Sequence, residues 1–397
     1  MHIVILGAGY AGLRAALDLD TLIQERGATA SVTLVDQNSY HQLVQLLHVT
    51  ATAGHDSREA IYDLAPLLSE SGVRFVQGRV VAIRPLAREV HLADGRALTY
   101  DRLVIALGAE TAYGNVPGAR EHTLPLRTYE HALRIRDHLR ARFAEAARVS
   151  EQRQQRILLT TAIVGGGYTG CQLAGELAAW ADDLCAETGA PRREVRIALL
   201  DRSSLLLKQF GPWATREAER TLDAMGVSVY LQTTVEAVEP ELLRVSDDRV
   251  LRAGTIVWAG GIQAPPLLRE SGLPVDAAGR ALVDRYLRVR DQALIFAAGD
   301  CAAIPDGPNG ATVPATASYA MRQGIHLAET LMAEIAGEPP RPYEPLKLGE
   351  LVSLGPNYAV GNPLGVPVVG YPALLLKKGV ESYYRATIEG PLKGVTL

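Results

Sequence analysis

The stretch "HIVILGAGYAGLRAAL" (residues 2–17) decides how the beginning of this chain folds. A short apolar run enters a glycine turn, and an Ala- and Leu-rich run follows it. In such a turn one glycine permits the tight bend, the next lets the backbone approach a pyrophosphate, and the third lets the helix pack against the strand. The stretch therefore predicts a dinucleotide-binding turn. The residues assigned to it are Gly7, Gly9, Tyr10, Ala11 and Gly12.

The same pattern returns at "IVGGGYTGCQLAGE" (163–176), where a second apolar run enters glycines and a helix. We assign Gly165, Gly167 and Gly170 to this second turn. A lone glycine motif is weak support for nucleotide binding, but each turn here lies between a predicted strand and a predicted helix. Two such turns indicate that one chain binds two nucleotides.

An acidic residue ends the strand that follows each turn. Asp36 ends the strand 31–36, and Asp201 ends the strand 195–201. An acid at this place can bind ribose hydroxyls and repels a 2′-phosphate. Asp201 therefore predicts NADH rather than NADPH, although the neighbouring Arg202 weakens that preference.

These patterns predict an α/β fold with two Rossmann-like dinucleotide-binding domains, one nested in the other, and a small C-terminal α+β segment. The simplest pair of nucleotides is FAD in the first unit and NADH at the second. Asp300, just beyond a predicted strand, is expected to reach the FAD ribitol or phosphate. The expected parts are an FAD-binding domain (1–120 and 285–340), an NADH-binding domain (121–284) and a C-terminal segment (341–397).

Three further expectations concern the connecting segments. Residues 73–83 and 88–99 alternate like antiparallel strands, with "ADGR" (93–96) as the turn between them. Residues 128–155 have the pattern of one long helix. The last segment, rich in Gly, Pro and Tyr, is expected to hold strands and loops with one short helix.

Composition excludes several classes of protein. The 397 residues are 48% hydrophobic and 21% charged, which is typical of a globular protein of two or three domains. The formal net charge of −4 gives no bulk attraction to nucleic acid. No run of 18 apolar residues occurs, and an initial strand leaves no room for a signal peptide. We therefore expect a cytoplasmic protein without a spanning helix.

The cysteines are relevant because several flavoenzymes of similar layout work through cysteine pairs. Cys171, Cys185 and Cys301 form no CxxC pair and no metal-ligand spacing with histidine. We interpret them as reduced thiols and expect no metal.

The chain resembles the flavoproteins with two dinucleotide-binding domains, and within them the type II NADH:quinone dehydrogenases. The likeness covers nearly the whole chain, and the combination is more specific than either glycine turn. The similar stretches are "VDQNSYHQLVQLLHVTATAG" (35–54), "LVIALGAETAYGNVPG" (103–118), "LPLRTYEHALRIRDHL" (124–139), "GGGYTGCQLAGEL" (165–177), "TIVWAGGIQAPPLL" (255–268), "AAGDCA" (297–302) and "LVSLGPNYAVG" (351–361).

The resemblance implies a respiratory-chain activity without proton pumping. NADH would reduce FAD and leave, and a quinone would then take two electrons and two protons. Ala317 and Ser318, at the start of the helix 316–336, would face the pyrimidine side of the flavin, where a helix N-terminus stabilises negative charge. Glu176 would lie close to the nicotinamide. Carried over by position, Gly7, Gly9, Gly12, Asp36 and Asp300 would bind FAD, and Gly165, Gly167, Gly170 and Asp201 would bind NADH.

The chain departs from the family pattern mainly at residues that would contact the quinone, the electron acceptor. The family usually has glutamate where this chain has Gln172, and an amide cannot take up a proton as a carboxylate can. Ser318 and Arg322 stand where the family often has glutamines, and Gln45 replaces the proline of its "PLL". Protonation of a quinone would then use water or another group, or the chain reduces a different acceptor.

Candidate catalytic residues are Gln172, Glu176, His41 and His48. The two histidines lie in the flavin-proximal segment 35–54, and either could donate a proton at neutral pH. Ordinary polar contacts to the flavin or the backbone are the alternative for both.

The C-terminal segment suggests a contact with the inner face of the cell membrane. Lys377 and Lys378 lie beside "YPALLL" (371–376), and one short basic and apolar segment binds a membrane weakly and reversibly. A homodimer through this segment is a further hypothesis.

Two alternative functions stay open. A sulfide:quinone oxidoreductase shares the fold, but it needs paired reactive cysteines, one normally in the C-terminal part, and no cysteine follows Cys301. A redox sensor that binds flavin and NADH with little turnover would fit the altered acceptor residues. Rapid quinone-dependent oxidation of NADH would exclude the sensor.

Overall fold

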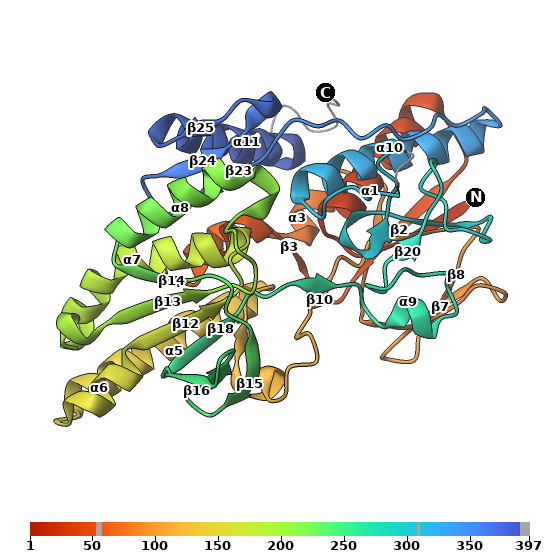
Figure 1. The fold of residues 1–397 in the computed structure, drawn as a ribbon. Coiled ribbons are helices and arrows are strands. Elements are labelled where there is room, and N and C mark those ends of the chain that lie inside the picture. Colours follow the sequence, from red (N-terminus) through yellow and green to blue (C-terminus); the bar gives the residue numbers. More distant parts are fainter. Residues whose placement is uncertain (53–57, 308–309, 390–397) are drawn as a thin grey trace.

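The structure is a computed structural model that describes residues 1–52, 58–307 and 310–389. Two five-stranded sheets lie side by side, and the C-terminal elements lie over both of them (Figure 1). Each sheet is parallel throughout and is covered by helices. Strands buried on both faces explain the near-continuous apolar runs of the sequence.

The first sheet has the strand order β21, β9, β1, β2, β5. Helices α1 (Tyr10–Arg26) and α10 (Ala317–Ala336) pack closely together on this sheet. Their approach requires Gly324, because a Cβ there would lie 2.3 Å from the carbonyl oxygen of Ala11. The strands are β1 (His2–Leu6), β2 (Ser31–Asp36), β5 (Arg74–Gln77), β9 (Arg102–Ile105) and β21 (Ile295–Ala297).

The second sheet has the strand order β11, β18, β12, β13, β14. Because β21 rejoins the first sheet after the second is complete, one unit is inserted into the other. The expected α/β class with nested Rossmann-like units is confirmed. The strands are β11 (Leu124–Pro125), β12 (Thr160–Val164), β13 (Arg196–Leu200), β14 (Val227–Tyr230) and β18 (Thr255–Trp258), and the main helices are α5 (Tyr129–Arg148), α7 (Tyr168–Thr188) and α8 (Pro212–Ala224).

Short elements complete the two units. Strands β6, β7 and β8 form an antiparallel sheet, as do β15, β16 and β17. The bounds are β3 (Tyr40–Gln42), β4 (Ile61–Asp63), β6 (Val80–Arg84), β7 (Glu89–Leu92), β8 (Ala97–Thr99), β10 (Glu110–Thr111), β15 (Val235–Glu239), β16 (Leu242–Val245), β17 (Arg249–Arg252), β19 (Ile262–Gln263), β20 (Ala281–Leu282), β22 (Ala302–Ala303), α2 (Leu47–Thr50), α3 (Leu64–Leu68), α4 (Ala119–His122), α6 (Gln152–Leu158) and α9 (Leu267–Glu270).

Two of the expected connecting elements differ from the structure. The "ADGR" turn joins β7 to β8, and not the run 73–83 to the run 88–99, because the first part of 73–83 is recruited as β5 into the parallel sheet. The single helix expected at 128–155 is divided into α5 and α6. Val149 is extended at the break, and the side chain of Gln155 donates to its carbonyl oxygen at 2.6 Å, which stabilises the interruption.

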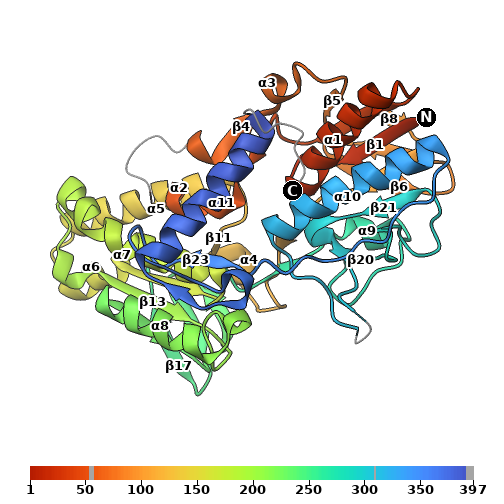
Figure 2. The ribbon, with the colours of Figure 1, turned by 90° about the horizontal axis from the view of Figure 1, so that it is seen from above.

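The C-terminal segment contains a longer helix than expected. Strands β23 (Leu351–Ser353), β24 (Ala359–Gly361) and β25 (Val368–Val369) form a small sheet, and α11 (Tyr371–Glu389) packs on it. Seen from above, α11 crosses from the second unit toward α3 and β4 of the first (Figure 2). The expectation for 390–397 lies outside the described residues. In the part of the chain that the structure covers, no helix is both long and apolar enough to span a bilayer.

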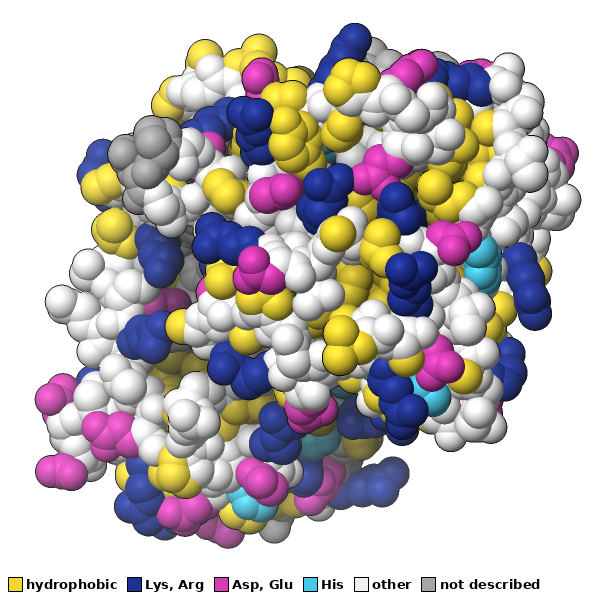
Figure 3. All heavy atoms as spheres, turned by 90° about the vertical axis from the view of Figure 1, so that its right-hand side faces the viewer, with side chains coloured by type: hydrophobic (Ala, Val, Ile, Leu, Met, Phe, Trp, Pro, Cys, Tyr) yellow, Lys and Arg dark blue, Asp and Glu magenta, His cyan; other side chains and the backbone are white. Residues whose placement is uncertain are grey.

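Charged side chains of both signs are interspersed on the face shown in Figure 3. Basic and acidic groups alternate there with apolar ones, which agrees with the small net charge.

Candidate functional site

A cavity of about 760 Å³ opens where the strands of the first sheet end. This size is within the range of small-molecule and cofactor sites. Its walls come from the turns after β1, β2, β9 and β21, and from the start of α10. The sequence-assigned residues among its lining are Gly7, Gly9, Tyr10, Ala11, Asp36, Asp300 and Ala317.

The first glycine turn has the geometry expected of a phosphate cradle. Gly7 has φ +98°, and a Cβ there would lie 2.3 Å from the carbonyl oxygen of Ala106. A Cβ on Gly12 would lie 1.8 Å from the carbonyl oxygen of Gly7, so the helix can approach the strand only with glycine. At Gly9 a Cβ would meet nothing within 4 Å, so this residue leaves room for a ligand beside the N-terminus of α1.

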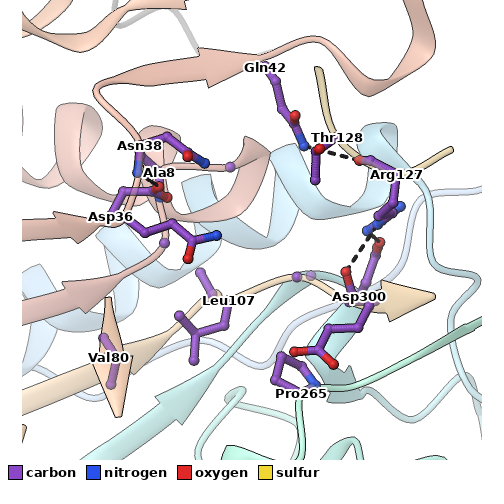
Figure 4. A pocket seen from close by; sticks show the side chains of 18 of the residues that line it. Ala8, Asp36, Asn38, Gln42, Val80, Leu107, Arg127, Thr128, Pro265 and Asp300 are labelled. Atoms are coloured by element: carbon purple, nitrogen blue, oxygen red, sulfur yellow. Dashed lines mark hydrogen bonds and ion pairs between the residues drawn. The ribbon is translucent and has the colours of Figure 1, made fainter. Parts of the chain in front are cut away.

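Asp36 fastens this turn to the end of β2. Its Oδ2 accepts from the backbone N–H of Ala8 at 2.7 Å, and its Oδ1 accepts from that of Asn38 at 2.8 Å (Figure 4). Burial raises the pKa of Asp36, while the backbone hydrogen bonds act in the opposite direction. The carboxylate is thus held at the rim of the cavity where a ribose would lie. An open Gly9, a helix N-terminus and this acid together fit FAD.

The second glycine turn repeats the same construction. Gly165 has φ +114°. A Cβ on Gly170 would lie 1.8 Å from the carbonyl oxygen of Gly165. Oδ2 of Asp201 accepts from Gly166 N at 2.5 Å, and Oδ1 accepts from Ser203 N at 2.7 Å. Gly167, at the start of α7, has open space around a hypothetical Cβ. This arrangement fits a second nucleotide, as the sequence predicted for NADH.

The start of α10 and the end of β21 form the opposite side of the cavity. Ala317 lines it, whereas Ser318 accepts a hydrogen bond from Nη2 of Arg322 at 2.6 Å. Asp300 lies after Gly299, whose N–H donates to Gln323 Oε1 at 2.7 Å. Gln323 is therefore a buried support for the Asp300 turn.

His41 lies behind the first glycine turn. Its Nδ1 lies 2.8 Å from the carbonyl oxygen of Ala8, and its Nε2 lies 2.9 Å from the hydroxyl of Tyr384. Burial lowers the pKa of His41 to about 4. A carbonyl only accepts, so Nδ1 carries the proton and Nε2 accepts from Tyr384. These contacts favour an ordinary polar role for His41, the alternative given above, over the donation of a proton at neutral pH.

His48 and Gln172 meet in a buried polar chain. Gln172 Nε2 donates to Ser353 Oγ at 3.2 Å, and Ser353 Oγ lies 3.2 Å from His48 Nε2. Burial, and secondly Lys377, holds the pKa of His48 well below its usual range. His48 is therefore neutral, and one hydrogen bond joins its Nε2 to the serine hydroxyl. The amide at 172 completes this chain without introducing a buried charge.

Glu176 lies one helical turn beyond Gln172 on α7 and faces α11. Burial raises its pKa to about 7, while Lys377 and Lys378 lower it. It is not among the residues that line the described cavity. Among the four candidate catalytic residues, Glu176 therefore has a carboxyl group that can change its protonation near neutral pH.

The sequence did not single out several residues that belong to the site. Arg127 and Gln42 line the cavity, and Ser353 and Tyr384 bond the candidate histidines. Arg127 lies within the quoted stretch "LPLRT", directly before Thr128, which caps α5 by accepting from His131 N. In the sequence, the arginine directly before this helix-capping threonine is the feature that could have indicated Arg127. The others are joined only by the tertiary fold.

The cysteines are buried and free. Burial raises the pKa of Cys301 to about 12 and raises those of Cys171 and Cys185. Sγ of Cys301 lies 3.3 Å from the carbonyl oxygen of Ala298. None of these thiols has the exposure and lowered pKa of a reactive cysteine.

Sequence comparisons agree with this geometry. Residues 1–324 match the family described as pyridine nucleotide-disulphide oxidoreductase. The chain is 29% identical to the type II NADH:quinone oxidoreductase of Staphylococcus aureus, over 96% of this chain and 94% of that protein. It is 32% identical to demethylphylloquinone reductase NdbB of Synechocystis sp., over 96% of this chain and 91% of that one. The resemblance found in the sequence motifs is confirmed.

Solved structures share the fold. NDH2 from Plasmodium falciparum, in complex with NADH, has a TM-score of 0.86 at 16% identity and covers 96% of this chain and 94% of its own. The sulfide:quinone oxidoreductase from Aquifex aeolicus has a TM-score of 0.79 at 21% identity, over 98% and 91%. At these identities the likeness concerns the arrangement of elements and not the chemistry.

Proposed function

The chain belongs to the pyridine nucleotide-disulphide oxidoreductase family, and we propose that it is an oxidoreductase that takes electrons from NADH and passes them to a quinone, with FAD as the bound carrier. The observation that carries the proposal is the pair of equivalent turns closed by Asp36 and Asp201. Two nucleotide sites on one chain suit electron transfer between two nucleotides. The names of the relatives over nearly the full length support NADH and quinone as substrates.

The protein's part is to bind, orient and exclude water. When bound, FAD supplies the two-electron redox chemistry. The N-terminus of α1 and the open side of Gly9 would hold the pyrophosphate, and Asp36 a ribose. The N-terminus of α10 at Ala317 would stabilise negative charge on the flavin ring. The turn at 165–170 with Asp201 would hold NADH.

The acceptor half requires protons, and Gln172 cannot supply them. Glu176 is proposed to exchange a proton during turnover, because its pKa is raised to about 7. Water is the competing source. Non-pumping operation is part of the proposal.

The two alternative functions are less well supported. Buried thiols with raised pKa values do not suit the paired cysteines of a sulfide:quinone oxidoreductase, even though that fold is similar. A sensor with little turnover is compatible with the same nucleotide sites, so it has to be separated by kinetics.

One experiment tests the function directly. The purified protein is mixed with NADH in the absence of oxygen, a short-chain quinone is then injected, and flavin absorbance is followed. The proposal expects bleaching by NADH and a rapid return with quinone. Bleaching without return would leave the NADH half standing and exclude the quinone. A protein without flavin absorbance, or one that NADH does not bleach, would overturn the proposal.

We also propose that the outer face of α11 contacts a membrane. Leu375, Leu376 and Val380 on α11 are exposed, and Lys378 lies among them. Lys377 does not share this surface, since it is buried and paired with Glu381 at 2.5 Å. An apolar face with a flanking cation suits reversible binding to an interface. The competing occupant of this face is a second copy of the chain.

Point variants test this face better than deletion, because the opposite face of α11 is part of the core. The triple variant Leu375→Ser, Leu376→Ser, Val380→Ser should lose co-sedimentation with anionic phospholipid vesicles. Val250→Ser, at an exposed apolar position of β17, is the control. Unchanged co-sedimentation would exclude the contact, and a dimer that the triple variant dissociates in sedimentation velocity would assign the face to a homodimer.

A further inference from the structure

We infer that Arg127 is a positioning residue for the flavin site, whose guanidinium fixes the carboxylate of Asp300 for cofactor binding. The inference rests on the proposed function, which requires FAD. Nη2 of Arg127 lies 2.5 Å from Oδ2 of Asp300, and both side chains line the cavity. They point toward each other in Figure 4, across the cavity from Asp36 and Asn38.

The two charges come from different sheets. Arg127 follows β11, which pairs with β18 in the second sheet. Asp300 follows β21, which pairs with β9 in the first sheet. Their ion pair therefore bridges the junction between the two nucleotide-binding units, beside the cavity.

Residues of the first unit hold both the side chain and the backbone of Arg127 at this junction. Its Nε donates to the carbonyl oxygen of Ala109 at 3.1 Å. The amide of Gln42 donates to the carbonyl oxygen of Arg127 at 3.3 Å and accepts from Tyr129 N at 3.1 Å. A guanidinium with a fixed plane sets the direction of its partner as well as its charge.

Asp300 needs such a partner in this cavity. FAD carries a doubly negative pyrophosphate, and an unpaired carboxylate near it would raise the free energy of binding by repulsion. The side chains of Asp300 and Arg127 are only 14% and 23% exposed, so water screens their charges weakly. With Oδ2 held by Arg127, Oδ1 can accept from a hydroxyl of the cofactor.

The rate at which the purified holoenzyme releases FAD tests the inference without using activity. Release is read as the rise of flavin fluorescence after dilution. Arg127→Met should release FAD about tenfold faster or more, as expected for loss of one charge-assisted hydrogen bond. Arg127→Lys should restore part of the slow release. In the Asp300→Asn background, Arg127→Met should add less than about threefold, because the two residues act as one unit.

Arg136→Met is the matched control, since Arg136 lies on α5, pairs with Asp137 and does not line the cavity. It should release FAD at the wild-type rate. An unchanged rate for Arg127→Met, or an equal effect with and without Asp300, would overturn the inference. If Arg127→Met fails to fold, Arg127→Lys in both backgrounds gives the same comparison. A wild-type protein that holds no FAD would instead contradict the proposed function.

Discussion

The hydroxyl of Tyr384 lies 2.9 Å from Nε2 of His41, although 343 residues separate them. His41 bonds the carbonyl oxygen of Ala8 through its other nitrogen. A chain of two hydrogen bonds thus links the C-terminal helix to the first glycine turn. Near the same place, Arg14 of α1 donates to the carbonyl oxygen of Thr387 at 3.0 Å. The end of α11 is therefore part of the support of the first turn.

Removal of the Tyr384 hydroxyl should lower the free energy of unfolding. Tyr384→Phe leaves Nε2 of buried His41 without its donor, which costs about 1–3 kcal/mol. Urea unfolding measured by circular dichroism checks this value. Tyr383→Phe, at the adjacent and less buried position, should change it little. Equal effects of the two variants would contradict the hydrogen bond.

Glu176 should make stability depend on pH. Its folded pKa of about 7 lies above the ordinary 4.5, so the folded protein holds the proton more tightly. This contribution is complete below pH 4.5 and is lost as the pH rises through 7. Glu176→Gln should therefore be more stable than wild type at pH 8, by on the order of 2 kcal/mol, and similar to it at low pH.

Unfolding free energies of both proteins at pH 5 and pH 8 check this prediction. Glu187→Gln, on the exposed side of the same helix, is the control and should show no such difference. A Glu176→Gln effect of the same size at both pH values would mean that Glu176 does not titrate in this range.

The second and third glycines of the first turn, Gly9 and Gly12, should respond differently to substitution by alanine. Gly12→Ala places a Cβ 1.8 Å from a backbone oxygen and should destabilise the first unit by about 3 kcal/mol or more. Gly9→Ala meets nothing within 4 Å, so folding should survive while FAD affinity falls about tenfold or more. Thermal unfolding and flavin content of the purified variants separate the two outcomes. A stable, FAD-loaded Gly12→Ala protein would contradict the close approach of α1 and β1.

Asp201 should determine the preference for NADH. Asp201→Ala removes the acceptor for Gly166 N and the charge that repels a 2′-phosphate. We expect KM for NADH to rise about tenfold and the ratio of kcat/KM for NADH over that for NADPH to fall. Steady-state oxidation of NADH and of NADPH with a short-chain quinone, at varied nucleotide concentration, measures both. An unaltered ratio would show that Asp201 only supports the turn and that another residue selects the nucleotide.

Gln172→Glu should restore a proton-exchanging group at a cost in stability. The new carboxylate would lie beside Ser353 in a buried site, where a charge is unfavourable. We expect lower unfolding free energy at pH 8 than at pH 5, and faster return of flavin absorbance after a quinone is added. Stopped-flow absorbance checks the rate. A slower return would mean that the amide is itself adapted to the acceptor.

Much of the site could be predicted from local sequence. The glycine turns were found because strand, turn and helix are consecutive, and their Cβ positions depend on nearby backbone. Asp36 and Asp201 end strands that follow directly. Long-range partners gave no such signal: Gln42, Ser353 and Tyr384 are polar residues of ordinary appearance whose bonding depends on which segments the fold brings together.

The sequence by itself determined the nested α/β fold and the two nucleotide turns, because apolar periodicity and glycine spacing act over a few residues. Only the tertiary structure decided which charges are buried and paired. Lys377 and Lys378 are neighbours in the chain, yet one is buried against Glu381 and the other is exposed. Arg127 and Asp300 lie 173 residues apart and meet because two sheets pack at one junction. Burial and pairing are properties of packed surfaces, which no single stretch of sequence contains.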